Sequence, residues 1–190
     1  MSRLSQKAKT GLLLLARQTV EQELFNKSDI KPDLSDPVLK ENRGAFVTIH
    51  LHGSLKGCIG IIEPMSPLKD VIRDMAKSSA FRDPRFTPLT RDEYPHIDFE
   101  ISVLTLPKKL DSPEDLQVAR HGLIISSGTR RGLLLPQVAV DNAWDRETFL
   151  SQTCLKAGLP RDIWRSGALI EVFEAEVFSE KNLNKLTDSP

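Results

Sequence analysis

Two β-type runs joined by a tight turn constrain the fold of this chain most. In residues 44–51, small or apolar residues occupy every second position, the pattern of a strand with one buried face. His52-Gly53-Ser54 supplies turn residues, and a second apolar run follows over residues 55–62. Two such runs separated by a short turn that contains glycine predict an antiparallel hairpin.

The second run carries an unusual thiol. It reads Leu55-Lys56-Gly57-Cys58-Ile59-Gly60-Ile61-Ile62. Glycine inside a strand marks a bulge, a bend, or a place where a ligand or another chain approaches the backbone. Strict alternation would place Lys56 and Cys58 on one face, where an ammonium group favours the reactive thiolate. The alternative is that Cys58 is a small buried hydrophobe.

The rest of the chain mixes helices with further strands. Periodicity and capping residues predict helices over residues 4–25, 67–80 and 144–157, the first with Ser5 as a plausible cap. Strands are predicted over residues 97–106, 122–126, 131–135 and 168–178. Hairpins with few helices between them predict an α+β fold, with a mainly antiparallel sheet and flanking helices. A length of 190 residues fits one domain, or one domain with a minor lobe.

Composition excludes several classes of protein. Lysine plus arginine equals aspartate plus glutamate, 26 each, so no net charge attracts nucleic acid. The two cysteines, Cys58 and Cys154, form no Cys-x-x-Cys pair and are too few for a disulfide framework. Cys154 lies within an apolar helix pattern, where we expect it in the core. No run approaches the roughly 20 apolar residues of a membrane span. We therefore expect a cytoplasmic protein without a membrane partner.

A proline-stiffened loop holds the main binding candidates. The sequence Arg82-Asp83-Pro84-Arg85-Phe86 could clamp a carboxylate or phosphate through charge-assisted hydrogen bonds. In that interpretation Arg82, Asp83, Arg85 and Phe86 contact a ligand or partner. Alternatively, Asp83 pairs with Arg85 or caps a turn, and the loop is a structural brace.

Candidates for acid–base and metal chemistry are sparse. His121 and Glu100 are candidates for a base and the group that orients it, if the fold gathers them near Cys58. His50 and His52 share a strand face, but no third ligand follows at a recognisable spacing, so surface histidines are favoured. The sequence has no phosphate-binding loop and no dinucleotide fingerprint. We expect neither a metal nor a cofactor.

The segment Leu55-Lys56-Gly57-Cys58-Ile59-Gly60 resembles the AMMECR domain family, whose pattern there has arginine in place of Lys56. Lysine keeps the charge but lacks the planar fork that binds an anion at two points. The resemblance extends from about residue 10 to 178. The other matching blocks are residues 44–48, 83–86, 101–105, 121–124, 131–132, 134–139, Trp144, 149–150, Cys154 and 156–159.

This resemblance implies a single AMMECR-like domain over residues 1–190, with a larger and a smaller lobe. Prokaryotic members resemble the A component of the AmmeMemoRadiSam system, which implies a Memo-like protein and a radical S-adenosylmethionine enzyme as partners. Gln137, in the matched block 134–139, joins Gly57 and Gly60 as a substrate- or partner-binding candidate. The resemblance implies no specific reaction.

Two classes of function stay open. In the first, Cys58 is a reactive thiol in a cleft with Lys56, Arg85 and either Glu100 or His121, and takes part in a tailoring or modification reaction. In the second, the same cleft is a non-catalytic surface for another protein. RNA binding is a third hypothesis, which the balanced charge does not favour.

Overall fold

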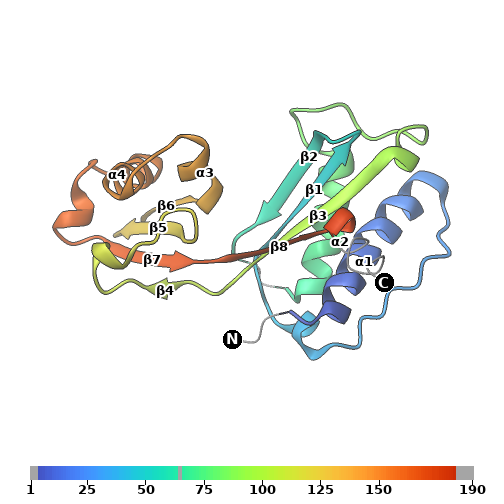
Figure 1. Cartoon of the computed structure of the whole chain (residues 1–190), viewed down its shortest axis with the longest axis horizontal. Helices are drawn as coiled ribbons and strands as arrows, with labels where there is room; N and C mark the ends of the chain where they lie inside the picture. The colour runs from blue at the N-terminus through green and yellow to red at the C-terminus, as the bar shows by residue number, and fades with distance from the viewer. Residues whose placement is uncertain (1–3, 64–65, 183–190) are drawn as a thin grey trace. The chain divides into compact units, whose positions relative to one another are not determined.

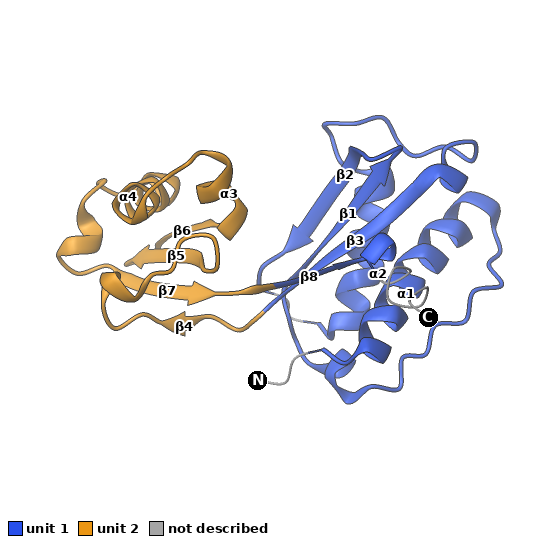
Figure 2. Cartoon of the chain, in the orientation of Figure 1, with its two compact units in different colours: residues 1–104, 176–190 blue, residues 105–175 orange. Residues whose placement is uncertain are grey.

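The computed structural model describes residues 4–63 and 66–182. The chain divides into two compact units (Figure 2), one formed by residues 1–104 with 176–190 and one by residues 105–175, called unit 1 and unit 2 below. Each contains a four-stranded sheet and helices, so the α+β prediction is confirmed. No helix within the described residues is both long and apolar enough to cross a bilayer.

Unit 1 is a sheet of order β2-β1-β3-β8 with two helices packed against it (Figure 1). The strands are β1 (Ala45–Leu51), β2 (Ser54–Ile61), β3 (Ile97–Leu104) and β8 (Ala175–Ser179). The helices are α1 (Gln6–Phe25) and α2 (Leu68–Phe81), and short 3-10 turns lie at Pro37–Lys40 (η1) and Tyr94–His96 (η2). Apolar residues of both helices and of the central strands form one core, which includes Leu12, Leu15, Ile72, Val47 and Phe99.

Local signals fix the ends of these elements. The Ser5 hydroxyl accepts a hydrogen bond from the Ala8 N–H at 3.1 Å, so the predicted cap of α1 is confirmed. At the hairpin turn His52 and Gly53 both have positive φ, 50° and 84°, as a tight two-residue turn between twisted strands requires. The β1–β2 pair is antiparallel, as predicted.

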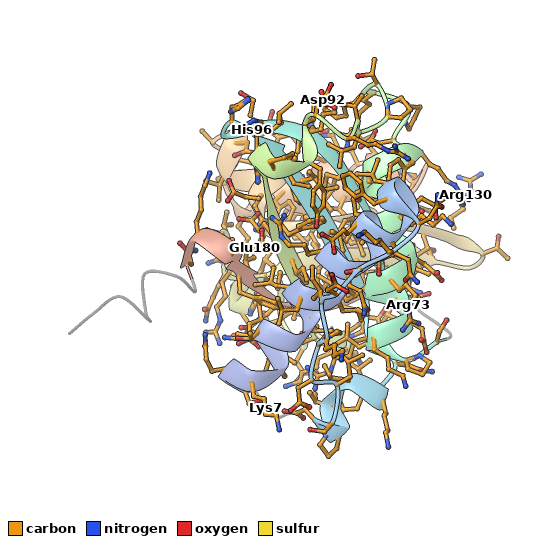
Figure 3. All side chains as sticks on the ribbon, turned by 90° about the vertical axis from the view of Figure 1, so that its right-hand side faces the viewer. Lys7, Arg73, Asp92, His96, Arg130 and Glu180 are labelled. Atoms are coloured by element: carbon orange, nitrogen blue, oxygen red, sulfur yellow. The ribbon has the colours of Figure 1, made fainter. Side chains whose placement is uncertain are left out.

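The helical turn that follows β8 is tied to the first helix. Glu180, labelled in Figure 3, follows β8 and binds Arg17 of α1 through two hydrogen bonds of 2.6 and 2.7 Å. The same guanidinium donates to the Ile97 carbonyl at 2.9 Å. This cluster holds the end of β8 against α1 and the start of β3.

Unit 2 has the sheet order β4-β7-β5-β6. Its strands are β4 (Lys108–Lys109), β5 (Gly122–Ser127), β6 (Arg130–Leu134) and β7 (Leu169–Phe173). Its helices are α3 (Pro136–Asp141) and α4 (Arg146–Lys156), with 3-10 turns at Pro113–Asp115 (η3) and Ile163–Arg165 (η4). The predicted β5–β6 hairpin is confirmed.

Some predicted elements differ from the structure. The single strand predicted over residues 168–178 is two strands, β7 and β8, which belong to different sheets. The helix predicted from Trp144 begins at Arg146, where the Asp145 carboxylate accepts from the Thr148 N–H at 2.8 Å. The helix predicted from Pro67 begins at Leu68, with Pro67 as its N-cap. The short elements α3 and β4 were not predicted, because a few residues carry no clear periodicity.

Candidate functional site

A β-bulge determines which face of the unit 1 sheet carries the Cys58 thiol. The β1–β2 register shifts by one residue and leaves Lys56 without a partner on β1, so Cys58 lies opposite Thr48. An unbroken ladder from the turn would place Cys58 opposite Val47, a fully buried residue. Because a one-residue slip exchanges the faces of a strand, the bulge turns Cys58 away from the core that Val47 faces. The Cys58 side chain is accordingly partly exposed.

Lys56 is the extra residue of the bulge, so Lys56 and Cys58 are not placed on one face by the regular alternation of side chains along a strand. Its ammonium lies 2.7 Å from a Glu93 carboxylate oxygen and 3.2 Å from the Thr87 hydroxyl, and its side chain is only 11% exposed. The Lys56 ammonium lowers the pKa of Glu93. The expected pairing of Lys56 with the thiol is thus replaced by an ion pair with a carboxylate.

Arg85 supplies a cation beside Cys58. Its guanidinium donates to the Cys58 carbonyl at 2.9 Å. The pKa of Arg85 is raised, chiefly by hydrogen bonds to Asp83 and to a smaller extent by its interaction with the Cys58 side chain. The Thr48 hydroxyl lies 3.3 Å from the Cys58 sulfur and also forms a hydrogen bond with it. A hydroxyl and a guanidinium therefore both interact with the thiol.

Asp83 connects the loop to the edge of β2. Its carboxylate accepts from the Cys58 N–H at 2.9 Å and binds the Arg85 guanidinium at two points, 2.9 and 2.7 Å. The Asp83 side chain is 1% exposed, and its hydrogen bonds with Arg85 hold its pKa well below the usual range. The Asp83–Arg85 pair of the brace interpretation is therefore present, and it covers an edge that would otherwise expose unpaired backbone groups.

The other two loop candidates lie beside this pair. Arg82 is the exposed C-cap of α2, where its N–H donates to the Ser78 carbonyl at 2.8 Å. The Phe86 ring lies under the Arg85 guanidinium, with 5.4 Å between the guanidinium carbon and the ring centroid. Phe86 thus contributes to the position of Arg85.

Glu100 lies in the same row of the sheet as the thiol. Thr48 is in register with Cys58 on β2 and with Glu100 on β3, so the three side chains stand on one face across three strands. All three are partly exposed. Thr48 separates the thiol from the carboxylate. Our sequence interpretation missed Thr48, because its register with Cys58 depends on the bulge.

The two glycines that flank the thiol make room for parts of the chain itself. A Cβ atom at Gly57 would lie 2.1 Å from the Ser79 carbonyl oxygen of α2, and one at Gly60 would lie 2.2 Å from the Phe46 ring. Of the three features that a glycine in a strand can mark, the structure has a bulge next to Gly57. At both glycines the close approach comes from this chain's own α2 or β1.

His121 and Gln137 belong to unit 2. The His121 Nδ1 atom accepts from the Gln117 N–H at 3.2 Å, and burial lowers the pKa of His121. Gln137 is exposed in the first turn of α3. Cys154 is fully buried in α4, as expected, and burial raises its pKa.

Two histidines near the hairpin turn lie against each other. His52 stacks on His96, with 4.8 Å between ring centroids. Across residues 4–63 and 66–182, no three histidine, cysteine or acidic side chains are arranged to hold a metal ion.

Comparisons with known proteins give a consistent result. A model of the AMMECR1 family matches residues 13–178. A protein of Methanosarcina mazei is 45% identical over 176 residues, which cover 88% of each chain. A protein of Thermofilum pendens is 46% identical over 198 residues, which cover 95% of this chain and 93% of the relative. The crystal structure of an uncharacterized protein from Pyrococcus horikoshii matches with a TM-score of 0.74 and 38% identity, over 92% of each chain.

Proposed function

Since the chain belongs to the AMMECR1 family, we propose that Cys58 is the reactive thiol of a tailoring or modification reaction. In this proposal the protein acts together with a Memo-like protein and a radical S-adenosylmethionine enzyme. The observation that carries the proposal is the bulge in β2, which places the thiol beside Thr48 on the partly exposed face of the sheet.

Two polar groups contact the Cys58 side chain. The Thr48 hydroxyl donates a hydrogen bond to the sulfur at 3.3 Å, and the Arg85 guanidinium also interacts with it. Asp83 neutralises part of the Arg85 charge, so the guanidinium contributes less than a free cation would. Thr48 and Arg85 together therefore determine the reactivity of the thiol.

Cys58 would act as a nucleophile or acyl acceptor. Its sulfur attacks an electrophilic carbon, a sulfur–carbon bond forms, and the leaving group departs with its bonding electron pair. Glu100 is the proposed base of this row, and the thiol proton passes to it by way of solvent on this partly exposed face.

Alkylation kinetics test the proposal. Native protein is treated with iodoacetamide across a range of pH, and modification of Cys58 and Cys154 is followed by peptide mass spectrometry. Cys154 is the internal control, because it is fully buried. We expect Cys58 to react at least about 10-fold faster than Cys154, and Thr48→Val or Arg85→Gln to slow it about 3- to 10-fold.

Two results would contradict a catalytic thiol. One is Cys58 alkylation that proceeds no faster than that of Cys154 and is unaffected by Thr48→Val. The other is a Cys58→Ser variant that fully replaces the native protein in cells lacking it.

The second candidate function is a non-catalytic interaction module. It is favoured by the ion pairs of the site, Asp83–Arg85 and Lys56–Glu93, which engage both cations internally. Under this alternative the loop braces β2, and the sheet face around Thr48 contacts another protein. RNA binding has less support, since the chain has as many acidic as basic residues, 26 of each.

A further inference from the structure

A cavity separate from the Cys58 site opens at the carboxyl end of α1. It has a volume of about 570 Å³, within the roughly 300–1,000 Å³ of small-molecule sites. Neither Cys58 nor the residues that contact its sulfur line it. The lining residues are Glu21, Phe25, Lys27, Ser28, Asp29, Ile30 and Tyr94.

Aromatic and aliphatic side chains give this cavity an apolar wall. The Phe25 and Tyr94 rings meet edge to face, with 5.6 Å between centroids and 71° between planes. Tyr94 is held from another direction by Arg17, whose guanidinium carbon lies 5.4 Å from the ring centroid. Ile30 completes the wall, and its carbonyl accepts from the Gln18 side chain at 2.7 Å. A flat or branched apolar group therefore has three preformed contacts.

The polar part of the lining is negative. Glu21 and Asp29 contribute carboxylates, against the single cation of Lys27. Ser28 donates a hydrogen bond to Glu21 and so fixes one of these carboxylates at the wall.

The carboxyl end of α1 also lies at this cavity, and Arg91 binds one of its carbonyls. The last turn of the 20-residue helix α1 contains no basic residue, so its own sequence does not offset the partial negative charge at a helix carboxyl end. One terminal carbonyl, that of Leu24, accepts a hydrogen bond from Arg91 at 2.8 Å. The cavity thus combines an apolar wall with two carboxylates, beside a helix end whose partial negative charge is partly offset by Arg91, which also lies 5.6 Å from the Phe25 ring centroid.

We propose that this cavity binds a small organic cation, a primary amine or amidine on an aromatic or branched alkyl body. The cationic group would meet the Glu21 carboxylate, and the body would lie against Phe25, Ile30 and Tyr94. This site is independent of the reaction proposed for Cys58.

Titration of the full chain with matched probes tests this proposal. Phenethylammonium, phenylethanol and phenylacetate share a body and differ in charge. Each is added to ¹⁵N-labelled protein at constant ionic strength, and amide chemical shifts are followed. We expect saturable shifts at residues 25–30 and at Tyr94 with phenethylammonium, and at least about 10-fold weaker binding of phenylacetate.

Two matched variants isolate the charge of the cavity. Glu21→Gln removes the carboxylate charge but keeps an oxygen that can accept from Ser28, and we expect it to weaken phenethylammonium binding about 3- to 10-fold. Phenylethanol binding should not change. The control is Glu23→Gln on the same helix, since Glu23 pairs with Lys77 at 2.8 Å and does not line the cavity.

The proposal is overturned by any of three results. These are the absence of saturable shifts with phenethylammonium, equal binding of phenylacetate, and an equal loss of affinity in the Glu21→Gln and Glu23→Gln variants. The amide spectrum of each variant also reports whether it is folded.

Discussion

Replacement of Asp83 should destabilise unit 1 through a small number of identifiable hydrogen bonds. The carboxylate accepts from the Cys58 N–H and from the Arg85 guanidinium. Hydrogen bonds to a charged group contribute about 1.5–3 kcal/mol each. The Arg85 side chain is 56% exposed. Water therefore solvates the guanidinium when the Asp83 carboxylate is removed, and the ion pair contributes less than about 1 kcal/mol to stability. We expect Asp83→Ala to cost about 2–4 kcal/mol, and Asp83→Asn about 1–3 kcal/mol because the amide still accepts from Cys58.

The same carboxylate makes this loss depend on pH. The Arg85 guanidinium holds the pKa of Asp83 below its value in the unfolded chain, about 4. A carboxyl group with a lowered folded-state pKa stabilises the fold fully above the unfolded-state value, and loses that contribution as the pH falls toward the folded-state value. The stability difference between the native chain and Asp83→Asn should therefore be largest near neutral pH and shrink below about pH 4.

The measurement must report on unit 1. Both tryptophans, Trp144 and Trp164, lie in unit 2, so their fluorescence does not follow unfolding around β2. Native-state hydrogen exchange of the amides in residues 45–61, compared between pH 3 and pH 7, gives the free energy of opening directly.

Asp33→Asn is the matched control. Asp33 also accepts from a backbone N–H two residues ahead and pairs with a lysine, but its side chain is 55% exposed. We expect only a small effect there. If Asp83→Asn changes the free energy of opening by less than about 0.5 kcal/mol, or no more than Asp33→Asn does, the account of Asp83 as a brace of β2 is wrong.

Two substitutions test the contact between β2 and α2. Gly57→Ala should cost about 1–3 kcal/mol, because its Cβ would lie 2.1 Å from the Ser79 carbonyl oxygen; an unchanged melting temperature by circular dichroism would contradict this. Ser79→Ala should cost about 1–3 kcal/mol, since the buried hydroxyl accepts from the Ile59 N–H at 2.9 Å and donates to the Val47 carbonyl at 2.7 Å. Faster hydrogen exchange at Ile59 would be its local signature, and unchanged exchange there would contradict this expectation.

The elements that the sequence predicts well are those with local signals. The cap at Ser5 and the turn at His52-Gly53 act within a few residues, so neighbouring side chains alone define them. The alternation in β3 likewise matches its buried residues Phe99 and Ile101.

The division of the last predicted strand depends on partners far away in sequence. Alternation continues through Glu174, where the structure changes from one sheet to the other. Thr105 fixes this point, because its N–H donates to the Glu174 carbonyl at 2.8 Å and its hydroxyl accepts from the Glu174 N–H at 2.9 Å. Nothing in residues 168–178 alone indicates that contact.

The candidate site was predicted in part for a similar reason. The glycine-flanked strand pattern indicated Cys58, and the loop with Asp83 and Arg85 was a separate candidate. The hydrogen bonds of that loop with the Cys58 backbone depend on the folded chain. The pairing of Lys56 with Glu93 instead of the thiol follows from the bulge.

With the bulge in β2, the number of residues between the turn and Cys58 determines which face of the sheet carries the thiol. Replacing a side chain in residues 54–57 leaves the register of this short stretch intact, whereas adding one residue with the bulge retained would place Cys58 opposite Val47 and reverse the direction in which the sulfur points. The number of residues in this stretch, more than the chemistry of their side chains, therefore decides whether the thiol lies on the partly exposed face of the sheet or in the hydrophobic core.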